Sequence, residues 1–591
     1  MASRPIELRC GQASACPSLS TLLANVYTGA GMAGRTYKRE VIASGAVVAS
    51  NHPLASAAGI EMLSSGGNAV DAAVATLFAL SVVEPMMVSP FGAGFFLIRD
   101  GRSGEVVFID NYATVPAAAS PEMYTPVLGS LDYETVDGTN TVGYRAIATP
   151  GALKGWAYAV ERYGRLPLAT LVEPAIRFAT AGFAASAYLV NMIRDSAAAI
   201  ARFPATAEVF LPENRPPCVG QVIVRGAYAR TLRQIADEGA ETLYTGRLAR
   251  VVVADMQANG GLITLDDLAK YAVCERDPVR GQYRGYDILS AAPPSSGGTH
   301  IVQMLNLLAA FPIGDDGLRF GEPGYVHLLA EVLKIAFADR RRHMADPDRL
   351  PVPVAELIST AYADQRRAGI DRGRARDHAA GQFAEVARFM GGEGSNTTHC
   401  TVIDADGTIV STTQTLQSAF GSKVTTPGTG MLLNNHMSLM DPVPGNPNSI
   451  AGGKRVLSSM APTIVVREGR PILAIGTPGG KRIFGAVAQA LLNVLDHRMT
   501  LQEAVEAPRV WTEGGQLELE DGFANLSGLT AALAALGHSV TLVEKVAGGM
   551  NGVLIDDDGW RHGAACWRAD GVPIGISGGP ARDSTESGVP Q

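Results

Sequence analysis

Hydrophobic and polar residues follow two different periods along this chain. Short β-branched runs with a period of two predict strands, and the clearest pair lies at 400–404 and 408–413. The linking Asp406-Gly407 favours a hairpin, because both turn residues must accept positive φ angles. Further strands are predicted at 46–50, 95–99, 462–467, 471–476, 553–556 and 560–566.

Longer stretches predict helices between these strands, at 69–83, 231–239, 247–259, 300–310 and 483–497. Asn51 and Asn68 are placed to cap two early helices, and Gly66-Gly67 ends the first of them. Because strands and helices are interleaved along the chain, the pattern predicts a layered α/β protein. No repeat with a period of roughly 20–50 residues occurs, which argues against a solenoid or a propeller.

Composition narrows the class of protein. The chain has 591 residues, 47% of them hydrophobic and 18% charged, so it can bury large cores and is not a disordered protein. The net charge of −8 comes without a basic run, and we expect no nucleic-acid partner. The longest apolar stretches, 69–83 and 484–495, contain polar residues and are too short to span a bilayer, so no membrane partner is expected.

The N-terminal segment up to about residue 38 has no charged start followed by an apolar core. We therefore expect no secretory signal, and a cytoplasmic protein. The six cysteines show no metal-ligand spacing, and no H-E-x-x-H, P-loop or EF-hand pattern occurs. We expect neither a metal nor another cofactor.

The most informative local feature is the junction Asn396-Thr397-Thr398-His399. It follows the Gly-rich stretch 390–395, which predicts an exposed loop, and it directly precedes the hairpin. A Thr between a loop that can be cut and a core strand suits an N-terminal-nucleophile enzyme. Cleavage would make Thr397 a new N-terminus, and its α-amine, with a pKa near ~7.7–8.0, would act as the base for its own hydroxyl.

Two other features gain meaning only in combination. Gly479-Gly480 lies between a predicted strand and a helix, where backbone N–H groups could form an oxyanion hole or the glycines could simply make a tight turn. Thr415 ends the second hairpin strand and could orient the nucleophile, although Thr is common in strands. The G-x-S-x-G match at 575–579 is a chance one, because only twelve residues follow it and no helix can form there.

The order of these motifs resembles that of the γ-glutamyltranspeptidases. The shared segments extend from about residue 40 to 568 and include 66–73, Thr149-Pro150-Gly151, 293–298, Thr397-Thr398-His399, Thr415, 427–430, Leu433-Asn434-Asn435, 457–460 and Pro478-Gly479-Gly480. The resemblance implies a four-layer αββα sandwich of the N-terminal-nucleophile hydrolase type. It also implies self-cleavage between Asn396 and Thr397. A flexible extension, 1–38, would then precede a large part, 39–396, and a small part, 397–591, which form one composite domain as an interlocked heterodimer.

The resemblance also assigns roles to residues. Thr397 would be the nucleophile, Thr415 would hydrogen-bond its hydroxyl, and Gly479 and Gly480 would hold the oxyanion. Ser458 and Ser459 would contact a carboxylate of a small-molecule substrate. The positions that complete the substrate-binding set are Gln417, Asn435 and Tyr112.

Three positions depart from the family pattern. Tyr112 stands where an Arg is expected to clamp the glutamyl α-carboxylate. Leu439 stands where an Asp is expected to bind the α-ammonium, with Asp441 two residues late, and Gln417 replaces an Asn. Losing both charged clamps would weaken γ-glutamyl binding by on the order of 3–6 kcal/mol, unless Asp441 or an Arg from elsewhere replaces them.

The sequence therefore predicts a self-processing hydrolase or acyltransferase that forms an acyl-enzyme on a small carboxylate-bearing substrate. Glutathione and other γ-glutamyl compounds remain candidates through the family. One alternative is an amide or C–C bond hydrolase of specialised biosynthesis, as in antibiotic pathways of the 4-alkylproline type. Another is a non-catalytic binding protein on the same fold, against which the joint presence of Thr397, Thr415, Gly479 and Gly480 argues.

Overall fold

A computed structural model describes residues 38–127, 133–314, 316–382 and 396–580. The predicted extension 1–38, apart from Lys38, and the predicted loop 390–395 lie outside the described residues.

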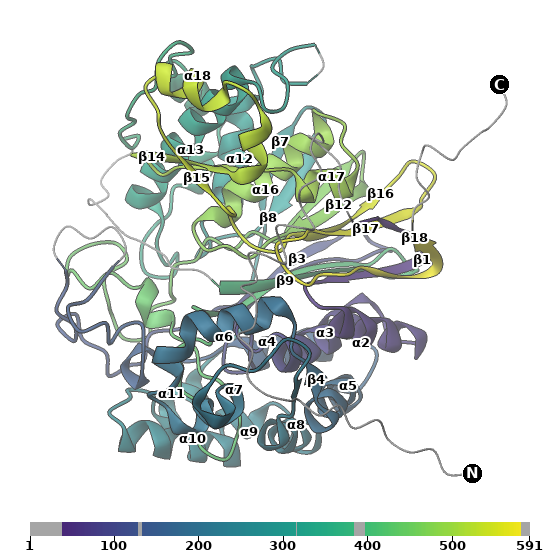
Figure 1. Cartoon of the computed structure of the whole chain (residues 1–591), viewed down its shortest axis with the longest axis vertical. Coiled ribbons are helices and arrows are strands. Elements are labelled where there is room, and N and C mark those ends of the chain that lie inside the picture. Colours follow the sequence, from purple (N-terminus) through teal and green to yellow (C-terminus); the bar gives the residue numbers. More distant parts are fainter. Residues whose placement is uncertain (1–37, 128–132, 315, 383–395, 581–591) are drawn as a thin grey trace, which may run out of the picture. The chain divides into compact units, whose positions relative to one another are not determined.

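One large antiparallel sheet forms the centre of the molecule (Figure 1). Its first half has the strand order β6 (Cys274–Arg276), β3 (Val106–Asn111), β2 (Ala93–Arg99), β10 (Ile409–Gln417), β9 (Asn396–Ile403), β1 (Val41–Ser50). Its second half continues with β17 (Arg561–Ala565), β16 (Asn551–Ile555), β12 (Arg470–Gly476), β11 (Thr463–Arg467), β8 (Tyr286–Ser290), β7 (Val279–Tyr283), while β18 (Ile574–Pro580) pairs with β1. The sheet curls so that β9 and β10 lie against β12 of the other half.

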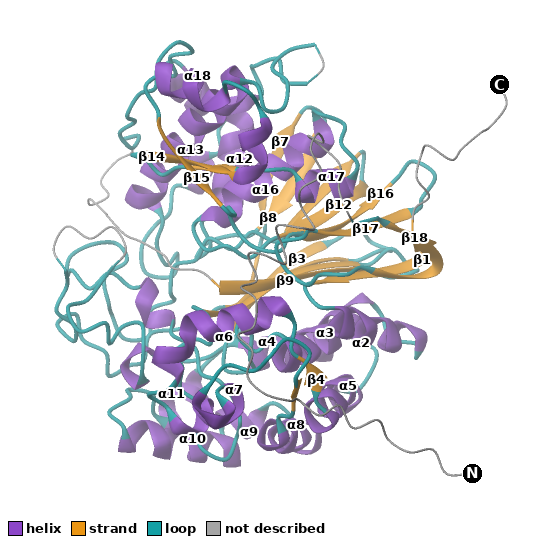
Figure 2. Ribbon diagram, viewed as in Figure 1, coloured by secondary structure: helices purple, strands orange, loops and turns teal. Residues whose placement is uncertain are grey.

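Helices cover both outer faces of the curled sheet (Figure 2). The first layer packs on β1, β2, β3, β9 and β10 and contains α2 (Pro53–Ser64), α3 (Ala69–Val83), α4 (Ala152–Tyr163), α5 (Leu168–Ala181), α6 (Ala187–Ile200), α7 (Pro204–Phe210), α8 (Gly226–Glu238), α9 (Glu241–Tyr244), α10 (Arg247–Ala258) and α11 (Leu265–Lys270). The second layer contains α12 (Gly297–Leu308), α13 (Pro323–His343), α14 (Val354–Leu357), α15 (Thr360–Arg367), α16 (Arg482–Leu495), α17 (Leu501–Glu506) and α18 (Leu529–Ala535). The predicted αββα fold is confirmed, with the two sheets joined through the pairing of β1 with β17.

The strands of the first half contribute side chains to two cores. Along β2, Phe95 and Leu97 enter the core between the sheet halves, and Phe96 and Ile98 enter the core against the first helix layer. This alternation follows from the two-residue period of a strand. It places the side chains of Thr397 and Thr415 between the two sheet halves, on the face that Phe95 shares.

The local sequence signals were mostly correct. Asn68 caps α3 and forms a capping box with Asp71, as the sequence predicts. The predicted cap of α2 is wrong, because His52 Nδ1, and not Asn51, accepts the hydrogen bond from the Leu54 amide at 3.2 Å. The amide of Asn51 instead donates to Thr398 Oγ1 at 3.4 Å, a contact between residues far apart in the chain.

Within the described residues, the remaining strands form a three-stranded sheet and a two-stranded sheet. They are β13 (Val510–Trp511), β14 (Gln516–Glu520) and β15 (Ser539–Val543), and the pair β4 (Phe183–Ala184) and β5 (Val222–Ile223). Within the described ranges, the helices are all too short or too polar to cross a membrane.

Candidate active site

The junction residues lie at the start of β9. Thr397 is 3% exposed and pairs across the hairpin with Thr415. The Thr397 hydroxyl donates to Thr415 Oγ1 at 3.1 Å, and the Thr415 hydroxyl donates to the carbonyl oxygen of Asn396 at 2.7 Å. The Thr397 hydroxyl is therefore hydrogen-bonded to Thr415, which in turn polarises the carbonyl of Asn396, the residue directly before Thr397.

A β-bulge fixes this arrangement. The pairing register shifts between Thr415 and Gln417, so that Gln417 lies opposite Asn396 with a φ of 85°. The amide of Gln417 donates to Thr415 Oγ1 at 2.8 Å, which uses the lone pair of Thr415 that remains beside its contact with Thr397. Bulges commonly re-aim side chains next to active sites. Gln417 is buried beside the nucleophile, and its predicted role in substrate binding stays a prediction.

Tyr112 lies in the same row of residues as the nucleophile. Thr397 pairs with Thr415, and Thr415 pairs with Ala93 on β2. Asn111 of β3 pairs with Gly94, so Tyr112 is one step further and comes beside Ala93. Directly opposed residues point to the same face of a sheet. With strands about 4.8 Å apart, Tyr112 is roughly 10 Å from Thr415, measured across the sheet.

Gly479 and Gly480 form the turn between β12 and α16, with φ angles of 146° and 52° that favour glycine. Neither amide donates a hydrogen bond to another described residue. A Cβ on Gly476, three residues earlier, would come within 2.3 Å of the His399 ring, so this turn begins close against β9. Two adjacent unpaired N–H groups beside the nucleophile strand suit the predicted oxyanion hole.

Ser458 and Ser459 lie on a segment that runs beside the residues after Tyr112, because the Val456 amide donates to the Ala113 carbonyl at 3.0 Å. The carbonyl of Ser458 is held by the amide of Ser296 at 2.8 Å and by its hydroxyl at 2.9 Å. Ser458 Oγ accepts from the Met460 amide at 3.2 Å, and its hydroxyl proton has no acceptor among the residues that the structure describes. That proton is free to bind a carboxylate.

The two positions where the resemblance expects charged clamps are both buried, and the loss of γ-glutamyl recognition stays a prediction. Tyr112 is 1% exposed and stacks on Phe95 with ring centroids 4.9 Å apart. Leu439 is buried in the same core. The carboxylate of Asp441 accepts from the Val443 amide and the Asn446 side chain, both at 2.8 Å, so each of its oxygens has a partner within its own loop.

Arg455 is hydrogen-bonded to the backbone of Tyr112 and to a buried carboxylate. Arg455 Nη1 donates to the Tyr112 carbonyl at 3.0 Å and to Asp110 at 3.2 Å. Asp110 is bound in turn by Arg276 at 2.9 Å. Arg455 therefore lies behind the backbone of Tyr112 and does not take the place of the expected clamp.

Asn435 is hydrogen-bonded to neighbouring segments of the chain. Its side-chain oxygen accepts from the Ser418 amide at 2.9 Å, and its Nδ2 donates to the Thr141 carbonyl at 2.9 Å. Its backbone amide donates to the Leu416 carbonyl at 3.1 Å. These bonds fasten the loop after Asn435 to the end of β10, and a direct role of Asn435 in substrate binding stays a prediction.

Sequence reasoning missed the groups behind the nucleophile strand. Thr398 points to the opposite face from Thr397, and its hydroxyl donates to Glu84 at 2.5 Å. Burial raises the pKa of Glu84 to about 8, against the lowering effect of this bond. On the nucleophile face, His399 bonds to Thr413 at 2.8 Å and to Thr401 at 3.0 Å, and burial lowers its pKa to about 3. The two-residue period of the strand could have indicated that Thr398 faces away from Thr397. Nothing in the sequence around Glu84 indicates that Thr398 is its partner.

One group of side chains has the composition of a metal site. His327, Glu331 and His538 bring ligand atoms within 4.8 Å of one another in the second helix layer. His327 Nδ1 and His538 Nε2 are hydrogen-bonded at 2.7 Å. Glu331 is bound by Lys334 at 2.9 Å and by His378 at 2.8 Å. Both ring nitrogens of His327 and both carboxylate oxygens of Glu331 therefore have protein partners.

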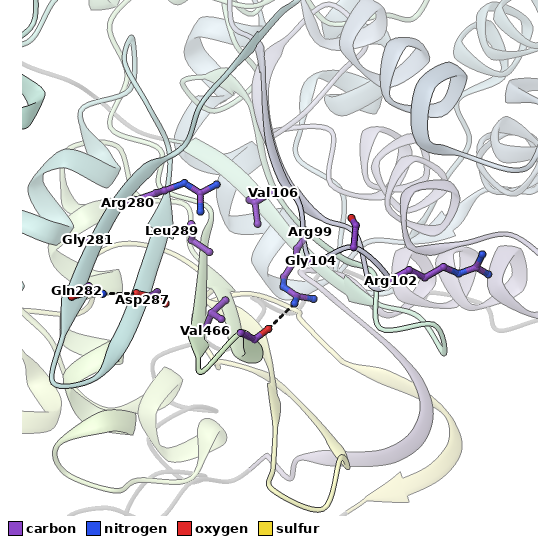
Figure 3. Close-up of a pocket in the computed structure, with 12 residues that line it drawn as sticks. Arg99, Arg102, Gly104, Val106, Arg280, Gly281, Gln282, Asp287, Leu289 and Val466 are labelled. Carbon is purple, nitrogen blue, oxygen red and sulfur yellow. Dashed lines mark hydrogen bonds between the residues drawn. The ribbon is translucent and has the colours of Figure 1, made fainter.

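An open pocket of about 620 Å³ lies at the far end of the same strands (Figure 3). It is lined by Arg99, Arg280 and Asp287, among others. Arg99 pairs with Ile409, six residues before Thr415 on β10. At about 3.4 Å per residue, the pocket is roughly 20 Å from the nucleophile and does not belong to its site.

Comparison with known proteins agrees with this geometry. The family described as gamma-glutamyltranspeptidase matches residues 55–576. "Acylase ACY 1 proenzyme" of Pseudomonas sp. (strain V22) is 52% identical over 549 residues, covering 92% of this chain and 96% of the relative. "Glutathione hydrolase proenzyme" of Escherichia coli (strain K12) is 36% identical over 533 residues, covering 88% and 90%.

Among solved structures, the cephalosporin acylase from Bacillus halodurans superposes with a TM-score of 0.82 at 28% identity, covering 93% of this chain and 99% of that one. The match of fold and sequence extends over both sides of the Asn396–Thr397 junction. The chain therefore belongs to the gamma-glutamyltranspeptidase family and is an enzyme of the N-terminal-nucleophile hydrolase type.

Proposed function

We propose that this enzyme is a self-processing acylase, which hydrolyses the amide of an acyl group other than γ-glutamyl. The observation that carries the proposal is the hydrogen-bond chain from the Thr397 hydroxyl through Thr415 to the Asn396 carbonyl. This chain of hydrogen bonds supports Thr397 as the nucleophile at the predicted cleavage point and Thr415 as the group that orients it.

Self-cleavage uses the same groups. Thr397 Oγ1 attacks the carbonyl carbon of Asn396, whose oxygen already accepts a hydrogen bond from Thr415. The C–N bond breaks, the hydroxyl proton passes to the departing nitrogen of Thr397, and the acyl group moves to Thr397 Oγ1 as an ester. Water then hydrolyses the ester and leaves a free α-amine on Thr397. The products are the large part, 39–396, which follows the N-terminal extension, and the small part, 397–591. They stay associated because β9 of the small part lies between β1 of the large part and β10.

Turnover then starts from the free α-amine of Thr397. The amine accepts the proton of the Thr397 hydroxyl as Oγ1 attacks the substrate carbonyl. The amides of Gly479 and Gly480 donate to the oxyanion that forms. The tetrahedral intermediate collapses, the leaving amine takes the proton, and water releases the acid from the acyl-enzyme.

The acyl group is inferred from the packing at Tyr112 and Leu439. Both side chains are buried, Tyr112 stacks on Phe95, and Asp441 and Arg455 are hydrogen-bonded to other groups. An α-amino acid head group would find neither of its two charged partners here. The relative named as an acylase, at 52% identity, and the cephalosporin acylase structure also support an acyl group other than γ-glutamyl. The hydroxyl of Ser458 favours a substrate that carries a carboxylate.

A denaturing gel of the purified protein, followed by rate measurements, tests the proposal. Wild type should separate into two fragments, and Thr397→Ser should do so too, because it keeps the hydroxyl. Thr397→Ala should stay full-length and inactive. The substrate panel should hold acyl p-nitroanilides, γ-glutamyl-p-nitroanilide and a ketone whose C–C bond can be hydrolysed. Turnover by Thr397→Ala, or a clear preference of wild type for the γ-glutamyl or the ketone substrate, would refute the proposal.

A further inference from the structure

The open pocket at the far end of the strands lies between the two halves of the curled sheet. Phe95 and Leu97 of β2 enter the core between the halves, and Arg99 follows them on the same face of the strand. On the opposing half, Arg280 of β7 pairs with Leu289 of β8, which belongs to the same core. Because directly opposed residues point to one face of a sheet, Arg280 also faces the space between the halves.

Guanidinium groups from both halves of the sheet line this pocket. Figure 3 shows the side chain of Arg280 pointing from β7 toward Val106 and Arg99. The third arginine of the lining, Arg102, points away from these two and forms an ion pair with Asp406 at 3.5 Å. The pocket therefore has two arginines that face it, one from each half.

Neither of these two arginines has a carboxylate partner among the residues that the structure describes. Arg99 is 8% exposed, and it donates only to backbone carbonyls, that of Gly469 at 2.9 Å and that of Asp100 at 3.5 Å. Arg280 is exposed, and its side chain has neither a hydrogen bond nor an ion pair within the described ranges. Two like charges that face one cavity repel each other, and a bound anion would offset both.

The acidic groups nearby are engaged in other hydrogen bonds. Asp287 is the one carboxylate in the described lining, and its Oδ1 accepts from the side chain of Gln282 at 3.0 Å. The carboxylate of Asp100 accepts from the amide of Ser103 at 2.7 Å and from its hydroxyl at 2.8 Å, within its own turn. Two arginines thus face the pocket against one carboxylate, on a chain whose net charge is −8. This local excess of positive charge favours an anion.

The same pocket has an apolar wall. Val106, Leu289 and Val466 contribute to the lining. Val106 pairs with Arg99, and Leu289 pairs with Arg280, so each arginine has an apolar neighbour on its own face of the sheet. The volume of about 620 Å³ is within the range of roughly 300–1,000 Å³ that is usual for small-molecule sites. The pocket can therefore hold a charged head and an apolar body together.

We propose that this pocket binds a small organic anion, a carboxylate or a phosphate monoester joined to a compact apolar group, through Arg99 and Arg280. A guanidinium has five N–H groups, and Arg99 uses two of them on the carbonyls of Gly469 and Asp100. The remaining donors form the planar fork that suits the oxygens of a carboxylate or a phosphate. The pocket is roughly 20 Å from the nucleophile, so this site is separate from the proposed acylase chemistry.

Isothermal titration of the full chain with four probes tests the proposal. Benzoate and phenyl phosphate carry the two candidate head groups, benzamide has the shape of benzoate without the charge, and inorganic phosphate lacks the apolar group. At least one organic anion should bind, and the tighter of the two identifies the head group. Benzamide and inorganic phosphate should each bind at least tenfold more weakly than that anion. Equal affinity for either of them, or no binding of both organic anions, would overturn the inference.

Two charge-matched variants locate the binding site. Arg280→Gln should weaken the anion at least tenfold, because a charge-assisted hydrogen bond is lost. Arg230→Gln removes the same charge from α8, where Arg230 is also exposed and has no ion pair in the described part of the chain, and it should leave the affinity unchanged. Equal affinities in wild type and Arg280→Gln, as for an anion bound near Ser458 instead, or equal weakening in both variants would overturn the inference. Binding is measured without turnover, so the result does not depend on the proposed function.

Discussion

The two ends of the row from Thr397 to Tyr112 differ in how their polar atoms are satisfied. At the Thr397 end, each hydroxyl proton has an acceptor, and a backbone amide supports Thr415. At the Tyr112 end, the wall is aromatic, and neither ring nitrogen of the buried His436 has a hydrogen-bond partner in the described part of the chain. The first end is complete without a ligand, as preorganised chemistry requires. We therefore expect the chemistry and the choice of acyl group to depend on separate parts of the site.

The largest expected effect is at the oxyanion turn. Gly479→Ala forces a Cβ to within 2.6 Å of Ala547 and a side chain onto a φ of 146°, so the turn must shift. Loss of one oxyanion donor typically lowers kcat about 10²–10³-fold, and we expect that loss on every acyl substrate. Gly469→Ala is the control, because Gly469 also has a positive φ but open space around it. Equal kcat values for the two variants would contradict the assignment.

Thr415→Val should come next. It removes the hydroxyl that connects Thr397 to the Asn396 carbonyl, and a hydrogen bond to a developing charge contributes about 1.5–3 kcal/mol. We expect self-cleavage and turnover to slow by roughly 10–150-fold. Thr412→Val on the same strand loses the bond to the Phe95 carbonyl at 2.9 Å on the opposite face. It should lower stability without slowing either reaction; a similar slowing would mean that strand integrity alone sets the rates.

The third prediction concerns the selective end. Tyr112→Arg combined with Leu439→Asp restores the two charged groups expected of γ-glutamyl enzymes. Since each charge-assisted bond contributes about 1.5–3 kcal/mol, kcat/KM for γ-glutamyl-p-nitroanilide should rise tenfold or more, and that for other acyl groups should fall. Each single variant should gain less. No gain in a folded, self-cleaved double variant would show that the replaced side chains do not define selectivity.

The smallest effect on turnover is expected behind the nucleophile strand, where a substitution should change the stability instead. The pKa of Glu84 is raised from 4.5 to about 8 by burial, so the folded state holds a proton that the unfolded state releases above pH 4.5. Stability from this group is present below pH 4.5 and is lost as the pH rises towards 8, by at most roughly 1.4 kcal/mol per pH unit. Glu84→Gln should therefore flatten the fall of Tm between pH 5 and 8. Glu61→Gln, at an exposed ion pair with Arg177, should not; parallel Tm curves for wild type and Glu84→Gln would refute the protonation of Glu84.

The sequence predicted what local patterns control. The Asp406-Gly407 turn, the hairpin and the position of Thr397 beside Thr415 follow from strand period and turn chemistry over about twenty residues. The pairing of β1 with β17, by contrast, joins residues more than 500 positions apart, and no local signal indicates it. The same reason explains why the sequence does not indicate the contact of the Asn51 side chain with Thr398, or that of the His436 ring with Tyr112, because both join residues far apart in the chain.

The central claim is that Thr397 is the nucleophile of a cleaved chain, and intact mass spectrometry of a quenched reaction tests it most directly. The predicted result is an acyl group on the fragment 397–591, located by peptide mapping at Thr397, and an unmodified first fragment. An acyl group on another residue, or turnover by a chain that is still intact across Asn396–Thr397, would contradict the account.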